Sequence, residues 1–206
     1  MKMSVEGTVI HIDLLPQEAE LLGSLVTQTI LLMQDYSPLP LDDNPVLAAL
    51  DIGGSSDLPD DPALARLFPD AYEDAEQSQE FRQLVEQGLI NRKLVDAATV
   101  SNALTEARAH AYLQGRGEDF DGDLDEAAQD GHEQRVSVSP EHFEAWIRTL
   151  NTVRLAVAAR VDITSVEVHQ VKLHDPETRP TVLVYDWLGV LLEGFIELRG
   201  EEMLGK

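Results

Sequence analysis

The sequence contains no cysteine among its 206 residues. Without a thiol, the chain cannot form disulfides, use a cysteine nucleophile or hold zinc through cysteine ligands. It also has no run of about 18 apolar residues, the length that a membrane-spanning helix needs. The N-terminal stretch lacks the apolar core of a secretory signal. We therefore expect a cytoplasmic protein without a membrane anchor.

Basic residues are scarce, because Lys and Arg number 15 against 38 Asp and Glu, which gives a net charge of -23. A field of this sign repels phosphate backbones and anionic lipids, so we expect neither nucleic acid nor a membrane as a partner. It favours a neutral or basic protein instead. The hydrophobic fraction of 43% is close to the globular average, so the chain has enough apolar residues to form a core.

The motifs that mark common active sites are missing. The sequence has no HExxH metal motif, no P-loop, no G-x-G-x-x-G and no G-x-S-x-G. Carboxylates are so numerous that no single pair stands out as an acid and a base. We therefore name no catalytic residue and expect no cofactor.

Hydrophobic periodicity predicts a mainly α protein, a single helical-bundle domain over residues 1–206 with a short β-strand or hairpin at its N-terminus. Residues 4–14 alternate between apolar and polar and are rich in β-branched side chains, which is typical of a strand. Helices are expected at 16–35, 62–68, 73–113, 140–161 and 180–199, and a short strand at 166–173. The pattern leaves open whether 73–113 is one helix or two, since Gly88 lies inside it.

Residues 117–137 are expected to form an acidic, flexible loop. Residues 117–133 hold eight acidic side chains and no Lys or Arg, so like charges keep the stretch extended and solvated. The candidate metal ligands are its alternating aspartates, Asp119, Asp121, Asp123 and Asp125. An EF-hand starting at Asp119 puts Leu124 where the turn needs glycine, and Asp130 where a bidentate glutamate belongs. We interpret the stretch as a tether rather than a calcium cage.

A first cluster of interest lies on the predicted helix 140–161 and on the last helix. Its members are Trp146, Asn151, Arg154 and Asp186. A polar Asn and Arg beside an apolar stripe need hydrogen-bond partners, and Asp186 or Glu193 is placed to supply one. The pattern fits either a clamp between helices or a contact site for a ligand or partner.

A second cluster comprises Phe68, Tyr72 and Arg82, in the stretch that leads into the long helix. Asp70 is expected to cap the next turn, and the two aromatic side chains to hold that turn against the helix. The alternatives here are ordinary packing and a peptide-docking groove.

The last helix is apolar on most of its sides. Its large apolar residues are Val182, Leu183, Tyr185, Trp187, Leu188, Leu191, Leu192, Phe195 and Ile196. A helix of this kind is either central to the core or in contact with another subunit. We therefore expect a homodimer through residues 180–198.

Three ordered stretches, "LFPDAY…EFRQL", "WIRTLNTVRLAV" and "YDWLGVLLE", resemble an actinobacterial family, domain-of-unknown-function family 2017 (DUF2017). The resemblance implies a cytoplasmic, mostly helical protein and carries over no catalytic residue. Genes of this family often lie beside the gene for the Clp protease adaptor that reads N-terminal residues. The resemblance therefore implies a link to Clp proteolysis, and some members carry the label of transcriptional regulator.

The favoured hypothesis is a non-enzymatic interaction or regulatory module with a protein partner. One alternative is a metal-binding protein or enzyme that uses carboxylates. Another is a transcriptional regulator. The net charge opposes this alternative, and the sequence shows no recognition helix rich in Lys and Arg.

Overall fold

The computed structural model of the chain describes residues 1–36, 57–115 and 133–204. Within these residues the fold is mainly α, as predicted, with six helices and one three-stranded sheet. The strands are β1 (Lys2–Glu6), β2 (Val9–Leu14) and β3 (Gln134–Val138). The helices are α1 (Pro16–Tyr36), α3 (Pro62–Leu67), α4 (Ala75–Gly115), α6 (Phe143–Arg160), α7 (Val166–His174) and α8 (Arg179–Leu204).

The sheet is antiparallel, in the order β1-β2-β3. β1 and β2 form the predicted hairpin, whose tight turn requires a positive φ of 64° at Gly7. In the register of the sheet Met3 pairs with Ile12, and Ile12 with Val136. One face, with Ile10, Ile12, Leu14, Val136 and Val138, is buried.

Strand β3 corrects the expected extent of the acidic loop. Residues 134–138 form the third strand of the sheet, and the first four of them belong to the predicted loop 117–137. Val136 and Val138 alternate with Arg135 and Ser137, so one face of β3 joins the core while the other faces solvent. Arg135 Nε donates to Asp13 Oδ1 across the strands at 2.8 Å.

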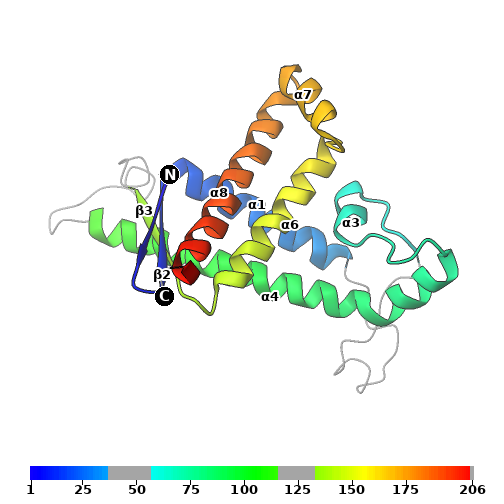
Figure 1. Cartoon of the computed structure of the whole chain (residues 1–206), viewed down its shortest axis with the longest axis horizontal. Helices are drawn as coiled ribbons and strands as arrows, with labels where there is room; N and C mark the ends of the chain where they lie inside the picture. Colours follow the sequence, from blue (N-terminus) through cyan, green and yellow to red (C-terminus); the bar gives the residue numbers. More distant parts are fainter. Residues whose placement is uncertain (37–56, 116–132, 205–206) are drawn as a thin grey trace.

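Helix α4 organises the bundle. Its 41 residues form one helix, which passes through Gly88 and spans about 60 Å. Figure 1 shows α4 in green along the length of the molecule, where it contacts α1, α6 and β3. The main core lies between these elements and α8, with Trp146 and Phe195 among its largest fully buried side chains.

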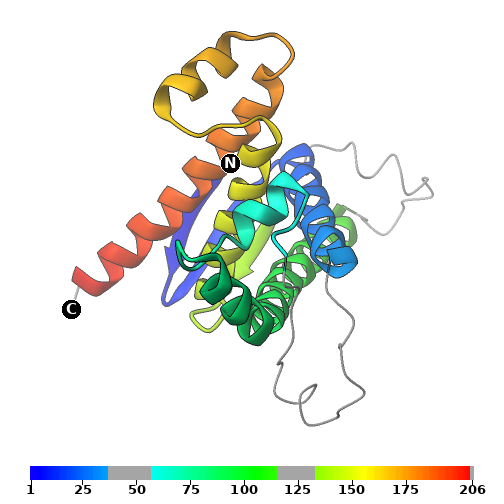
Figure 2. The ribbon, with the colours of Figure 1, turned by 90° about the vertical axis from the view of Figure 1, so that its right-hand side faces the viewer.

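Helix α7 replaces the strand predicted at 166–173, and that prediction is wrong. The alternating valines of "VEVHQVKL" imitate a strand, but Ser165 caps a helix by accepting a hydrogen bond from Val168 N at 3.3 Å. α7 has no buried residue and packs on α8, and Figure 2 shows it projecting beyond the rest of the bundle. No strand lies beside it among the described residues, so period-two alternation has no sheet to join.

No helix in the described ranges is long and apolar enough to cross a membrane.

Candidate functional site

The stretch between α3 and α4 is held in place from both sides. At the start of α3, Asp61 accepts hydrogen bonds from the backbone N–H groups of Ala63 and Leu64 and pairs with Arg160 of α6 at 2.8 Å. At the start of α4, Asp74 Oδ1 accepts from Gln77 N at 2.9 Å. The capping role expected of Asp70 thus belongs to Asp74, and the Asp70 side chain instead accepts a hydrogen bond from Arg82.

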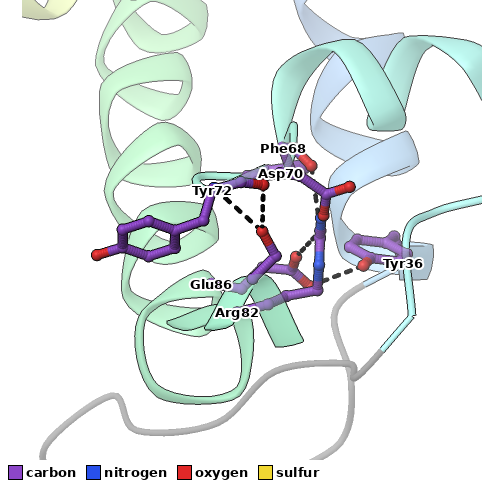
Figure 3. A network of polar contacts seen from close by, with 7 residues as sticks. Tyr36, Phe68, Asp70, Tyr72, Arg82 and Glu86 are labelled. Carbon is purple, nitrogen blue, oxygen red and sulfur yellow. Dashed lines mark hydrogen bonds and ion pairs between the residues drawn. The ribbon is translucent and has the colours of Figure 1, made fainter. Parts of the chain in front are cut away.

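Arg82 is the centre of a buried polar network, shown in Figure 3. Its guanidinium donates to Phe68 O at 3.0 Å, to Glu86 Oε2 at 2.5 Å and to Asp70 Oδ1 at 2.8 Å. Only 4% of the Arg82 side chain and 3% of the Glu86 side chain are exposed. Such a pair is tolerated in the interior only when its remaining hydrogen bonds are also made, and here they are.

Tyr36, at the end of α1, completes the network. Its hydroxyl donates to Glu86 Oε1 at 2.7 Å, and its ring stacks on Phe68 with the ring centroids 6.0 Å apart. Burial, with the hydrogen bond to Glu86 and the charge of that carboxylate, raises the pKa of Tyr36 above its ordinary value of 10.0. The native state therefore holds the phenolic proton more tightly than the unfolded chain does.

This shift predicts a loss of stability at alkaline pH. The stabilising effect is complete below the unfolded pKa of about 10 and is lost as pH rises towards the higher native pKa. We expect the unfolding free energy of the wild type to fall above that pH more steeply than that of Tyr36→Phe. Urea unfolding of both proteins at several alkaline pH values measures this difference. An equal decrease of the unfolding free energy with pH in both proteins would contradict the prediction.

A hollow of about 210 Å³ opens beside the network. We call it the Arg82 hollow, and its lining residues are Leu67, Phe68, Pro69, Asp70, Ala71, Ser78, Phe81, Arg82, Glu86 and Leu89. Tyr72 lies edge-on to Phe81 next to the hollow, with ring centroids 5.8 Å apart. Tyr72, Phe81 and Leu89 are all exposed, so the hollow is bordered by exposed apolar surface.

The polar groups in the wall of the Arg82 hollow are bonded to one another. Glu86 is already engaged by Arg82 and Tyr36, and Ser78 Oγ donates to Tyr72 O at 2.8 Å. The buried polar groups of the wall therefore fix its shape. The hollow is also smaller than the roughly 300–1,000 Å³ of typical small-molecule sites.

The second predicted cluster is thus brought together. Phe68 and Arg82 both line the hollow, and Tyr72 contacts it through the ring of Phe81. Asp70 pairs with Arg82 instead of capping a turn. Sequence reasoning missed Tyr36 and Glu86. The spacing of Glu86 four residues after Arg82 on one helix is a readable sign of a pair, whereas nothing in the sequence singles out Tyr36.

The first predicted cluster is only partly assembled. Trp146 is fully buried and stacks on Phe195, with ring centroids 5.6 Å apart. The Arg154 guanidinium lies over the ring of Tyr185, 4.1 Å from its centroid.

The acidic partner expected for this cluster is engaged elsewhere. Asp186 accepts from His169 of α7 at 2.7 Å, and Asn151 is exposed. Within the described ranges Arg154 forms no ion pair, so α6 and α8 are joined here by a cation–π contact rather than by Asp186.

Groups of three or more histidines and carboxylates placed to hold a metal ion do not occur in residues 1–36, 57–115 and 133–204. The candidate ligands Asp119, Asp121, Asp123 and Asp125 lie outside the described residues.

The comparisons with known proteins agree with the resemblance noted from the sequence. The family model described as "Domain of unknown function (DUF2017)" matches residues 2–198. No significant match was found among curated proteins or among solved structures. Because the match covers nearly the whole length of the sequence, the chain belongs to the DUF2017 family.

Proposed function

We propose that the protein is a non-enzymatic interaction module that binds a protein partner at the Arg82 hollow. The observation that carries the proposal is an apolar, exposed rim around a hollow whose polar wall is saturated by its own hydrogen bonds. A wall of this kind is rigid before binding, so a partner loses little entropy in ordering it.

Two exposed apolar residues of the lining provide the test. Phe81 and Leu89 line the hollow from α4, with 36% and 40% of their surfaces accessible. We expect Phe81→Gln/Leu89→Gln to weaken partner binding at least tenfold, because both side chains lose the apolar contact while glutamine keeps the helix. The measurement is an affinity capture of the tagged protein from its own cell lysate, quantified by mass spectrometry.

Leu113→Gln is the matched control. Leu113 lies on the same helix and is 63% exposed, but it is far along α4 from the hollow. The proposal requires partners that are kept by Leu113→Gln and lost by the double variant. Partners retained equally by both variants would move the contact away from the hollow.

A homodimer through residues 180–198 remains part of the proposal. α8 exposes Leu183, Val190 and Ile196, but Glu193 and Glu197 are exposed on the same helix. Two copies therefore bring like charges together, and salt is expected to strengthen their association by screening that repulsion. Sedimentation velocity at low and high ionic strength measures this effect. A protein that is monomeric at both ionic strengths would contradict the proposed dimer.

The cytoplasmic location and the link to Clp proteolysis, both implied by the family resemblance, also belong to this proposal. The gene neighbourhood implies a pathway shared with the Clp adaptor and not a direct contact with it.

A further inference from the structure

We infer that α7 is a cover, which opens independently of the rest of the bundle and uncovers an apolar patch beneath it. The patch, which we call the α7 patch, consists of Ala158, Ile163 and Val182, a small buried cluster separate from the main core. Leu173 is the α7 residue that packs against this cluster. None of these residues lines the Arg82 hollow, so the cover is distinct from the proposed docking site.

Few contacts hold α7 on the bundle. Its nine residues include no buried one, and α8 is the element against which it mainly packs. Figures 1 and 2 both show α7 at the tip of the α6–α8 pair, away from α4. A helix of nine residues is not stable in water by itself, because the cost of starting a helix is recovered only over about 12–15 residues. Loss of its contacts with α8 therefore also unfolds α7.

One side-chain hydrogen bond joins α7 to α8 in the part of the chain that the structure describes. It lies between His169 Nε2 and Asp186 Oδ1, which are 2.7 Å apart. The ring of His169 also contacts that of Tyr185, with centroids 5.9 Å apart. The Asp186 side chain is 41% exposed, so water is able to take the place of His169 when α7 leaves. The bond to Asp186 thus acts as a latch that opens at low cost.

The residues that precede and follow α7 are fixed. Before it, Ile163 N donates to Ala158 O at 2.9 Å, and Ile163 O accepts from Arg66 Nη1 at 2.8 Å. After it, Arg179 N donates to Asp175 O at 2.8 Å, at the start of α8. Residues 164–174 are therefore able to leave while α3, α6 and α8 keep their places.

The α7 patch stays assembled when α7 opens. Ala158 belongs to α6 and Val182 to α8, and these two helices pack directly against each other. Tyr185, which packs against the patch, is also held from α6, because the guanidinium of Arg154 lies 4.1 Å from its ring centroid. Opening therefore removes Leu173 and leaves an apolar surface facing water. In the closed form the chain blocks this surface with its own side chain.

Hydrogen exchange of the wild-type protein, followed by mass spectrometry, tests the opening. The amides of residues 169–174 are hydrogen-bonded within α7, so they exchange only when the helix opens. We expect them to be protected at least a hundredfold less than the amides of residues 150–157 of α6. Their exchange should also change little in low concentrations of urea, because a local opening exposes little surface.

A single cysteine tests whether the patch is uncovered. The chain has no cysteine of its own, so the new thiol is the only one that a reagent can label. Val182→Cys places it in the α7 patch, and Val153→Cys places it in the main core as the control; the two valines are 0% and 1% exposed. We expect a soluble disulfide reagent to label Val182→Cys at least a hundredfold faster than Val153→Cys.

Two histidine variants test the latch. His169→Phe keeps a ring beside Tyr185 but removes the bond to Asp186, and we expect it to raise the labelling rate of Val182→Cys about fivefold. His174→Phe is the matched control, because the His174 ring bonds to Gln170 O within α7 and not to α8. It should change that rate by less than about twofold, and neither variant should alter the rate of Val153→Cys.

Three results would overturn the cover. Equal protection of α7 and α6, or equal labelling of the two cysteine variants, would show that α7 opens only when the whole fold unfolds. A labelling rate of Val182→Cys that His169→Phe leaves unchanged would mean that another motion exposes Val182. Equal effects of His169→Phe and His174→Phe would show that the bond to Asp186 does not hold α7 closed.

Discussion

Arg82→Met is expected to lower the free energy of unfolding by about 3–5 kcal/mol, because it removes one member of a buried ion pair and leaves the other without its counter-charge. The methionine fills much of the space of the arginine stem, so the loss reports charge rather than volume. Among the described residues Glu86 then keeps only the Tyr36 hydroxyl as partner, and Phe68 O and Asp70 lose the donor that Arg82 supplied. Urea unfolding followed by far-UV circular dichroism measures the change.

Two further variants establish the cause. Adding Glu86→Gln to Arg82→Met should restore part of the loss, since the amide oxygen still accepts from Tyr36 and no charge is left unpaired. Arg199→Met is the control, because Arg199 pairs with Glu144 and both side chains are about half exposed, at 49% and 47%, and such a pair is worth about 1 kcal/mol or less. Equal losses for Arg82→Met and Arg199→Met would show that burial does not set the cost.

Trp146→Ala has the second largest expected effect, a loss of about 3–5 kcal/mol of unfolding free energy. The indole is fully buried and stacked on Phe195, so truncation leaves a cavity between α6 and α8 that a helical backbone cannot close. The melting temperature from circular dichroism measures it. A melting temperature equal to that of the wild type would show that Trp146 is not a core residue.

Trp146→Phe is the matched variant. Trp146 Nε1 is buried and finds no hydrogen-bond acceptor among the described residues. Phenylalanine keeps an aromatic ring against Phe195 and removes this unsatisfied donor, so a much smaller loss is expected. A loss as large as that of Trp146→Ala would point to a role for the indole N–H itself.

The elements with strong local signals could be predicted from the sequence. The hairpin at the N-terminus follows from alternation, and α1, α4, α6 and α8 follow from apolar spacing with few internal breaks. Phe68, Tyr72 and Arg82 form one predicted cluster because all three lie within fifteen residues of the start of one helix.

What could not be predicted depends on distant partners. β3 is a strand because β2 offers it an edge, and that edge comes from residues far away in the sequence. α7 buries no residue, so its apolar spacing does not distinguish a helix from a strand. Its N-terminal cap at Ser165 is the local feature that favours the helix. Tyr36 joins the Arg82 network only because α1 ends beside α4, which no local pattern encodes.

The position of the three strands in the sequence also determines when the sheet can be completed during synthesis. β1 and β2 leave the ribosome early, but β3 begins only at Gln134, and at about 5–20 residues per second this delay is on the order of ten seconds. During that interval the edge of β2 has no strand to pair with, and the apolar face of Ile10 and Ile12 is incomplete. His11 and Asp13 on the opposite face, with Lys2 and Glu6 on β1, place polar and charged groups on the nascent hairpin. Such residues disfavour pairing of the hairpin with strands of other chains before β3 has been synthesised.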